Sequence, residues 1–223
     1  QAINVLLKGN DYDLIRRRVN YDLTVLGIGA VKTGFNKSEG ATVEYVDPAD
    51  LVYSYTDSPY FDDIYYVGEV KDVPINELVK QFPELNEKEI KDILNSNNQT
   101  SGRYSRKYSY GRETDNNKVQ VLYFNYKTYM NDVYKVKETA TGAQKAIEKD
   151  DTFNPPEDAQ VNFMKLQRSV ECLFEGAFIV GTDKIISWKK VDNMMRSKSD
   201  FNKVKMNYSI TAPRMYNGRI ESL

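Results

Sequence analysis

The stretch VQVLYFNYKTYM, which runs from Val119 to Met130, decides the fold class of this chain. Its β-branched and aromatic residues favour an extended strand. Asn131-Asp132 is a turn signal that leads into Val133 to Lys137, so the sequence predicts a β-hairpin. In the first strand of this hairpin the side chains alternate between two faces, with Val119, Val121 and Tyr123 on one and Leu122, Phe124 and Tyr126 on the other.

The rest of the second half is also mainly strand. Cys172 shares one face of a strand with Val170 and Phe174, whereas Glu171 and Glu175 point away. We interpret Cys172 as a buried small hydrophobe and not as a nucleophile, because that face is apolar. Gly176 is expected to end this strand. Residues 178–180 and 185–188 predict another hairpin, and residues 139–167 predict no element.

The first half combines helices with hairpins. An apolar stripe at helical spacing, which ends at Gly27, predicts a helix that Asp11 or Asp13 can cap. Two shorter helices are expected over residues 74–81 and from Asn86 onward, and both must pack on a sheet because neither is long enough to be stable alone. The first stripe consists of Ile15, Val19, Leu23 and Leu26, and the expected strands are 30–35, 41–46, 51–55 and 64–70.

These patterns predict an α+β fold with two lobes. Residues 1–94 are expected to form a lobe with helices and antiparallel strands, and residues 119–212 a mainly-β lobe. Residues 95–118 contain no Val, Ile, Leu, Phe or Met, which predicts a polar linker or exposed loop between the lobes. Residues 213–223 are expected to return from the second lobe toward a further helix.

Composition excludes several classes of protein. The chain of 223 residues has 31 Lys and Arg against 32 Asp and Glu, so bulk positive charge does not hold nucleic acid. It has no His and one Cys, which excludes Ser-His-Asp triads and His- or Cys-rich zinc sites. We expect no catalytic residue, no metal and no cofactor. The longest apolar run is seven residues, from Val25 to Val31, so no membrane span is expected.

The chain begins at Gln1 and ends at Leu223 with no start or stop signal, and we expect it to be a piece of a longer protein.

Two basic stretches are candidate contacts for nucleic acid or an acidic partner. A solvated surface is the alternative interpretation of both. In the loop candidate, basic and aromatic residues alternate as in single-strand binders: Arg103, Tyr104, Arg106, Lys107, Tyr108 and Arg112. The patch candidate, opposed only by Asp192 and Asp200, comprises Lys184, Lys189, Lys190, Arg196, Lys198, Lys203 and Lys205.

Tyr60-Phe61-Asp62-Asp63 matches the Tyr-x-Asp-Asp string in which adjacent carboxylates hold magnesium. It raises the hypothesis of a magnesium-dependent nucleic-acid-processing enzyme that uses Asp62 and Asp63. Such a site needs a third carboxylate on a neighbouring strand. The alternative is a turn that leads into the strand beginning at Ile64.

The order of features also resembles a known family. An apolar helix precedes Gly27 to Phe35, and a strand pair around Val46-Asp47-Pro48 follows. Next come the acidic residues Asp57, Asp62 and Asp63, the strand Tyr65 to Val70, and a short helix that ends at Phe82-Pro83. This order resembles the wing-to-stem stretch of portal (head-to-tail connector) proteins of tailed phages, particularly short-tailed and crAss-like phages. The strands at 119–123, 170–174, 178–180, 185–188 and 208–213 resemble those of the portal clip.

The resemblance implies a structural function. A portal subunit forms a homo-oligomeric ring, usually of twelve copies, at one vertex of the capsid. Double-stranded DNA passes through the ring without sequence preference, and the major capsid protein, the packaging terminase and a tail adaptor bind to it. The resemblance implies a location in the virion after synthesis in the bacterial cytoplasm. A magnesium-dependent enzyme and a generic phage adaptor or host-binding module remain the alternatives.

Overall fold

The computed structural model describes residues 2–36, 40–86, 88–94, 118–138, 142–150, 152–154, 163–192 and 194–222. It confirms a mixed α+β fold in which the sheets are mostly antiparallel. The first half contains α1 (Ala2–Gly9), α2 (Tyr12–Val25), β1 (Gly29–Asn36), β2 (Gly40–Val46), a 3-10 turn η1 (Pro48–Asp50), β3 (Leu51–Tyr53), β4 (Tyr66–Pro74), α3 (Ile75–Gln81) and a helix at 88–94. The second half contains β5 (Lys118–Glu138), β6 (Gln144–Lys149), β7 (Phe163–Ile179), β8 (Ile185–Lys190), β9 (Tyr208–Thr211), β10 (Met215–Tyr216) and β11 (Arg219–Ile220).

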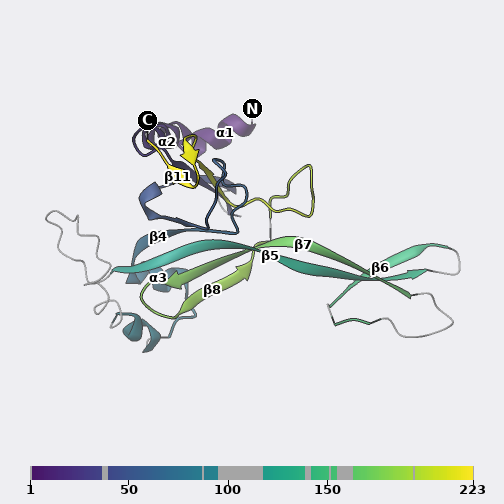
Figure 1. The fold of residues 1–223 in the computed structure, drawn as a ribbon. Helices are drawn as coiled ribbons and strands as arrows, with labels where there is room; N and C mark the ends of the chain where they lie inside the picture. The colour runs from purple at the N-terminus through teal and green to yellow at the C-terminus, as the bar shows by residue number, and fades with distance from the viewer. Residues whose placement is uncertain are drawn as a thin grey trace.

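The main sheet has the strand order β3-β4-β5-β7-β8, and β6 pairs with the far end of β5. β5 and β7 pair along almost their whole lengths, from Val121 opposite Ile179 to Lys137 opposite Phe163. Beyond the end of β4 these two strands continue out of the body of the molecule, and β6 joins them (Figure 1). We call this projecting part, residues 130–138, 144–149 and 163–170, the arm.

Two sequence-based predictions about these strands are wrong. Asn131 and Asp132 do not form a turn, because they pair with Ser169 and Arg168 of β7, and the Asp132 carboxylate lies 3.4 Å from the Arg168 guanidinium. Gly176 does not end β7. Its partner across the ladder is Phe124, and a Cβ atom at Gly176 would lie 2.7 Å from the Phe124 ring. Because Gly176 has no side chain, the Phe124 ring has room to lie over β7, which continues without a break.

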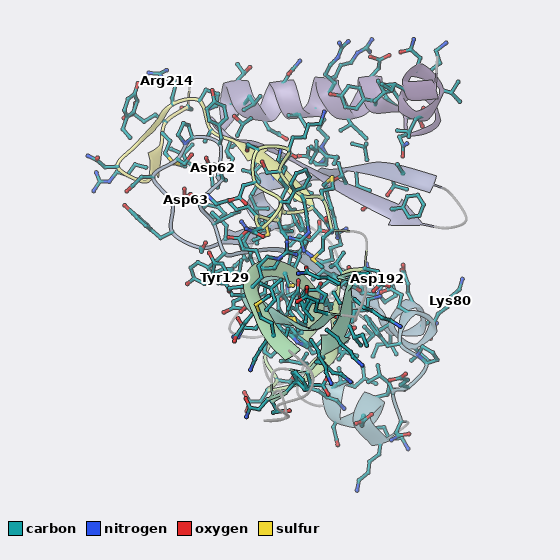
Figure 2. All side chains as sticks on the ribbon, turned by 90° about the vertical axis from the view of Figure 1, so that its right-hand side faces the viewer. Asp62, Asp63, Lys80, Tyr129, Asp192 and Arg214 are labelled. Atoms are coloured by element: carbon teal, nitrogen blue, oxygen red, sulfur yellow. The ribbon has the colours of Figure 1, made fainter. Side chains whose placement is uncertain are left out.

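The predicted N-terminal helix and first hairpin are confirmed. α2 packs on the smaller sheet, whose strand order is β2-β1-β9, and Gly27 follows the helix with a φ of 78°. A Cβ atom at Gly29 would lie within 3.0 Å of Val19 and Leu23, so this glycine sets the close approach of α2 to β1. Asp11 occupies the N-cap position but makes no side-chain capping hydrogen bond. Figure 2 shows the helices as a layer above this sheet.

Both hydrophobic cores lie on the same face of the main sheet. The first joins Val67 and Leu173 to the smaller sheet, and the second joins Val121 and Ile179 to α3 and the 88–94 helix, where Leu78 is 1% exposed. Cross-strand partners point to the same side of an antiparallel sheet, and the register places these four strand residues on one side. The other face of the main sheet contributes no residue to either core.

The main sheet spans the boundary expected between the two lobes. β4 pairs with β5 from Tyr66 opposite Tyr126 to Pro74 opposite Lys118, although residues 95–118 separate them in the sequence. β9, expected in the second lobe, instead pairs with β1 of the first. Of the predicted linker, only Lys118 lies within the described residues, where it begins β5.

At Gly68 the main sheet leaves no room for a side chain. A Cβ atom there would lie 2.6 Å from the Tyr123 carbonyl oxygen and 2.8 Å from the Phe124 Cβ. We expect Gly68→Ala to lower the free energy of unfolding by about 2 kcal/mol in urea titrations, because backbone must move to relieve the overlap. Gly9→Ala is the control, since a Cβ at Gly9 meets nothing within 4 Å. Equal stability of the two variants would contradict this packing.

Candidate functional site

The loop that carries Asp62 and Asp63 is well anchored. Phe61 is 4% exposed, adopts a φ of 54° and packs edge-on against Tyr53, with ring centroids 5.1 Å apart. The Thr56 hydroxyl donates a hydrogen bond to the Asp63 carboxylate. A hydrogen bond from the Ser58 side chain is the largest of the effects that hold the pKa of Asp62 below its usual value. The two carboxylates thus take part in local turn hydrogen bonds.

Within the ranges that the structure describes, no third metal ligand joins this pair. Among the described residues, no three Asp, Glu, Cys or His side chains lie close enough together to hold a metal ion. In Figure 2, Asp62 and Asp63 lie between Arg214 above and Tyr129 below. The geometry favours the turn interpretation of Tyr60-Phe61-Asp62-Asp63 over a magnesium site.

Interactions within the protein engage part of the predicted basic patch. Lys184 Nζ lies 2.5 Å from Glu89, and Lys189 Nζ lies 2.9 Å from Glu175. Arg196 donates hydrogen bonds to the backbone carbonyls of Glu171 and Phe201. These three residues fix β8 and the following loop to the body. The patch stays a prediction for Lys190, Lys198, Lys203 and Lys205, and the basic-aromatic loop at Arg103–Arg112 lies outside the described residues.

A buried charge cluster centred on Glu69 joins the two sheets. The side chain of Glu69 is 3% exposed, and its Oε1 lies 3.0 Å from the Nζ atoms of both Lys32 and Lys71. The Tyr208 hydroxyl donates to the same oxygen at 3.3 Å. Lys32 belongs to β1 and Tyr208 to β9, whereas Glu69 and Lys71 belong to β4. Because this carboxylate faces both ammonium groups, we interpret the cluster as a structural junction.

A cavity of about 440 Å³ adjoins this junction, but its chemistry is mixed. Its lining includes the basic residues Lys32 and Lys71 and the acidic residues Asp50, Asp72 and Glu77. Because positive and negative side chains both line the cavity, its charge favours neither anionic nor cationic ligands, and the lining selects no ligand class.

The open face of the main sheet is the strongest candidate for a functional site. A groove of about 240 Å³ crosses it, and apolar atoms form its surface. Ile185 is 54% exposed, Trp188 48% and Val52 38%, which are large values for apolar side chains in a sheet. We call this surface the aromatic face, and it consists of Val52, Tyr66, Leu122, Phe124, Tyr126, Phe174, Phe178, Ile185 and Trp188.

Trp188 organises the aromatic face. Its ring stacks on Phe174, with centroids 5.2 Å apart and planes 13° apart, and it lies within 6.0 Å of Phe124 and Tyr126. Gly68 and Gly176 flank Phe124 on the two neighbouring strands, so no Cβ atom prevents that ring from lying low over the sheet. The result is a shallow apolar surface that spans the five strands β3, β4, β5, β7 and β8.

This surface suits a protein segment better than a small polar substrate. Small-molecule sites combine apolar walls with a few convergent polar groups that orient the ligand, and the groove lining offers no charged side chain. An exposed aromatic surface of this kind is typical of protein–protein contacts. In the sequence, the only indication of this aromatic face was the alternation that places Leu122, Phe124 and Tyr126 on one side of a strand. The alternation did not show which side of the sheet the hydrophobic cores would cover.

No protein-family model matches the chain, and no curated protein matches it with significant similarity. Every helix in the described ranges is too short or too polar to cross a lipid bilayer.

Buried tyrosines at the sheet junction predict a loss of stability at alkaline pH. Burial, followed by the negative charge of Glu69 and its hydrogen bond, raises the pKa of Tyr208. Burial also raises the pKa of Tyr123 to about 12. An unfolded tyrosine loses its proton near pH 10, so the folded state binds more protons than the unfolded state above that pH. Stability should therefore be intact below pH 10 and fall as the pH rises further.

We expect Tyr208→Phe to make this alkaline loss shallower by about 1.4 kcal/mol per pH unit, because the unfolded chain then has one tyrosine fewer to ionise. Urea unfolding between pH 7 and pH 11.5 measures the slope. At pH 7 the variant should be about 1 kcal/mol less stable, because it lacks the hydrogen bond to Glu69. An unchanged slope above pH 10 would show that Tyr208 ionises freely in the folded protein.

Proposed function

We propose that this chain is a structural subunit of a phage portal, which forms a ring at one vertex of the capsid through which DNA enters and leaves. The observation that carries the proposal is the aromatic face. It is an apolar surface that no element among the described residues covers, and burying it between subunits would remove the free-energy cost of exposing it to water.

A second exposed apolar surface supports a ring over a symmetric dimer. Ile3 and Leu6 of α1, three residues apart and therefore on one side of the helix, are 74% and 37% exposed. A helix and a sheet groove differ in shape, and two unlike surfaces on one chain suit head-to-tail contacts between copies. Repeated head-to-tail contacts close into rings when the rotation between copies is right. The order of sequence features from Gly27 to Pro83 supports the portal among ring-forming proteins.

In this function the chain works through its shape and its contacts. The partners we propose are other copies of the chain, the major capsid protein, the packaging terminase, a tail adaptor and double-stranded DNA that passes without sequence preference. The location we propose is the capsid vertex of the virion. The local hydrogen bonds of Asp62 and Asp63 favour this function over the magnesium-dependent enzyme.

Ile185→Glu tests the proposal, because it places a charge on the aromatic face at a side chain that is 54% exposed in the single chain. We expect the variant to fold but to need at least about a tenfold higher concentration to assemble, since a buried unpaired charge costs more than 1.4 kcal/mol. Electron microscopy and sedimentation of the whole protein measure the rings. Ile185→Leu, which keeps an apolar side chain, is the matched control.

Trp188 provides a second readout, because it is the only tryptophan in the chain and lies on the aromatic face. Its emission should shift to shorter wavelength when the wild-type protein assembles, and not with Ile185→Glu. Discrete wild-type monomers at high concentration, or rings of Ile185→Glu at the wild-type concentration, would refute the proposal.

A further inference from the structure

A second cavity lies on the face of the main sheet that carries the hydrophobic cores. Its volume is about 210 Å³, and its lining includes Tyr123 and Asn125 of β5. Both residues share a face of β5 with Val121 of the second core, and they lie opposite Glu69 and Val67 of β4. Because Val67 belongs to the first core, the cavity occupies the band between the two cores. We call it the inter-core cavity.

The inter-core cavity contains a buried amide without a partner. Asn125 is 3% exposed, yet its side chain makes no hydrogen bond to any residue that the structure describes. No fully enclosed side-chain nitrogen or oxygen in the described ranges lacks a partner, so the amide of Asn125 must be open to the cavity that it lines. A buried polar group left unpaired costs stability, and a cost of this kind is typical of groups that serve a ligand.

Three separate elements place aromatic residues around this amide. Tyr123 lies in β5, Phe82 follows α3 and Tyr208 lies in β9. The Tyr123 hydroxyl donates to Gln81 at 2.7 Å and the Tyr208 hydroxyl to Glu69 at 3.3 Å, which holds both rings in place. Aromatic side chains pack well against flat rings. Since ligand pockets for larger molecules enclose about 300–1,000 Å³, the inter-core cavity has room for about one ring system.

The charges around the cavity favour an uncharged ligand. The inter-core cavity adjoins the cavity of about 440 Å³, because Lys32 lines both. Lys32 and Lys71 each lie 3.0 Å from Glu69, and Lys189 lies 2.9 Å from Glu175, so every lysine in the two linings is beside a carboxylate. An anionic ligand would have to compete with these carboxylates for the lysines.

The amide of Asn125 determines which ring fits. It offers an NH₂ donor next to a carbonyl acceptor, the pair with which asparagine binds N6 and N7 of adenine. The Ser187 hydroxyl also lines the cavity and can donate or accept. A complementary ring therefore carries a donor beside an acceptor, as the edge of a nucleobase does. The adjoining cavity gives space for an uncharged substituent such as a ribose.

We propose that the inter-core cavity binds a free nucleoside, with the base among the aromatic rings and its polar edge on the Asn125 amide. The inference goes beyond the proposed portal function and does not rest on it. The inter-core cavity and the aromatic face lie on opposite sides of the main sheet, so their ligands do not compete for one surface.

The test is binding of adenosine, cytidine and uridine to the 223-residue chain, measured by ligand-observed NMR. The variant is Asn125→Leu, which keeps the size of the side chain and removes the amide. Asn131→Leu is the matched control, because Asn131 is an exposed residue of the same strand outside the cavity. On the wild type, toluene tests whether the polar edge matters, and adenosine 5′-monophosphate tests whether a phosphate adds affinity.

We expect at least one nucleoside to bind the wild type and Asn131→Leu with equal affinity, and Asn125→Leu at least about tenfold more weakly. Toluene should also bind at least about tenfold more weakly than that nucleoside, and the monophosphate should bind no more tightly than adenosine. Without ligand, Asn125→Leu should unfold at the same urea concentration as the wild type or a higher one, because an apolar group replaces an unpaired buried amide.

Several outcomes would overturn the inference. They are the absence of nucleoside binding at millimolar concentration, equal affinity of Asn125→Leu and the wild type, and equal affinity of the wild type for toluene. A monophosphate that binds at least about tenfold more tightly than adenosine would assign the binding to phosphate. Unfolding of Asn125→Leu at a lower urea concentration would assign the amide a structural role. The portal function is judged separately, by the rings of the whole protein, which Asn125→Leu is not expected to alter.

Discussion

The continuous pairing of β5 with β7 is the constraint on which the rest of the structure depends. One ladder, from Val121 opposite Ile179 to Lys137 opposite Phe163, runs through the body and out into the arm. Because side chains alternate strictly along it, the register that buries Val121 and Ile179 also determines which face each arm residue occupies. A shift by one residue would exchange the buried valines with the aromatic face and turn Lys135 and Lys137 to the opposite side of the arm.

The two faces of the main sheet have different roles. One face carries both hydrophobic cores, together with the Glu69 junction that ties β4 to β1 and β9. The other has a continuous aromatic surface instead of a core, with Gly68 and Gly176 beside the Phe124 ring. A sheet covered on one side only is common in antiparallel folds, but its free side is usually polar. The apolar free side is the physical reason to expect assembly.

Charge is arranged in a similarly one-sided way. Inside the body the lysines near carboxylates are paired, as in Lys32 and Lys71 with Glu69 and Lys184 with Glu89. On the arm, Lys135, Lys137, Lys145, Lys149 and Lys165 occupy one face of the strands, and Asp132, Glu138 and Glu148 occupy the other. The net charge of −1 is a sum over the whole chain. It therefore excluded attraction to nucleic acid by bulk positive charge, but it gave no information about how charge is distributed over the surface.

Features that depend on neighbouring residues could be predicted from the sequence alone: the apolar stripe of α2, the hairpin of β1 and β2, and the burial of Cys172. Features that depend on a distant partner could not. Asn131-Asp132 carries a turn signal, yet β7 supplies its backbone partners. Glu171 does point away from the face of Cys172, but it is 8% exposed because its carboxylate accepts hydrogen bonds from Tyr129 and from the Val204 amide. Lys135 and Lys165 likewise lie opposite each other although they are 30 positions apart in the sequence, because register is set by hydrogen bonds between strands and only tertiary structure decides which strands meet.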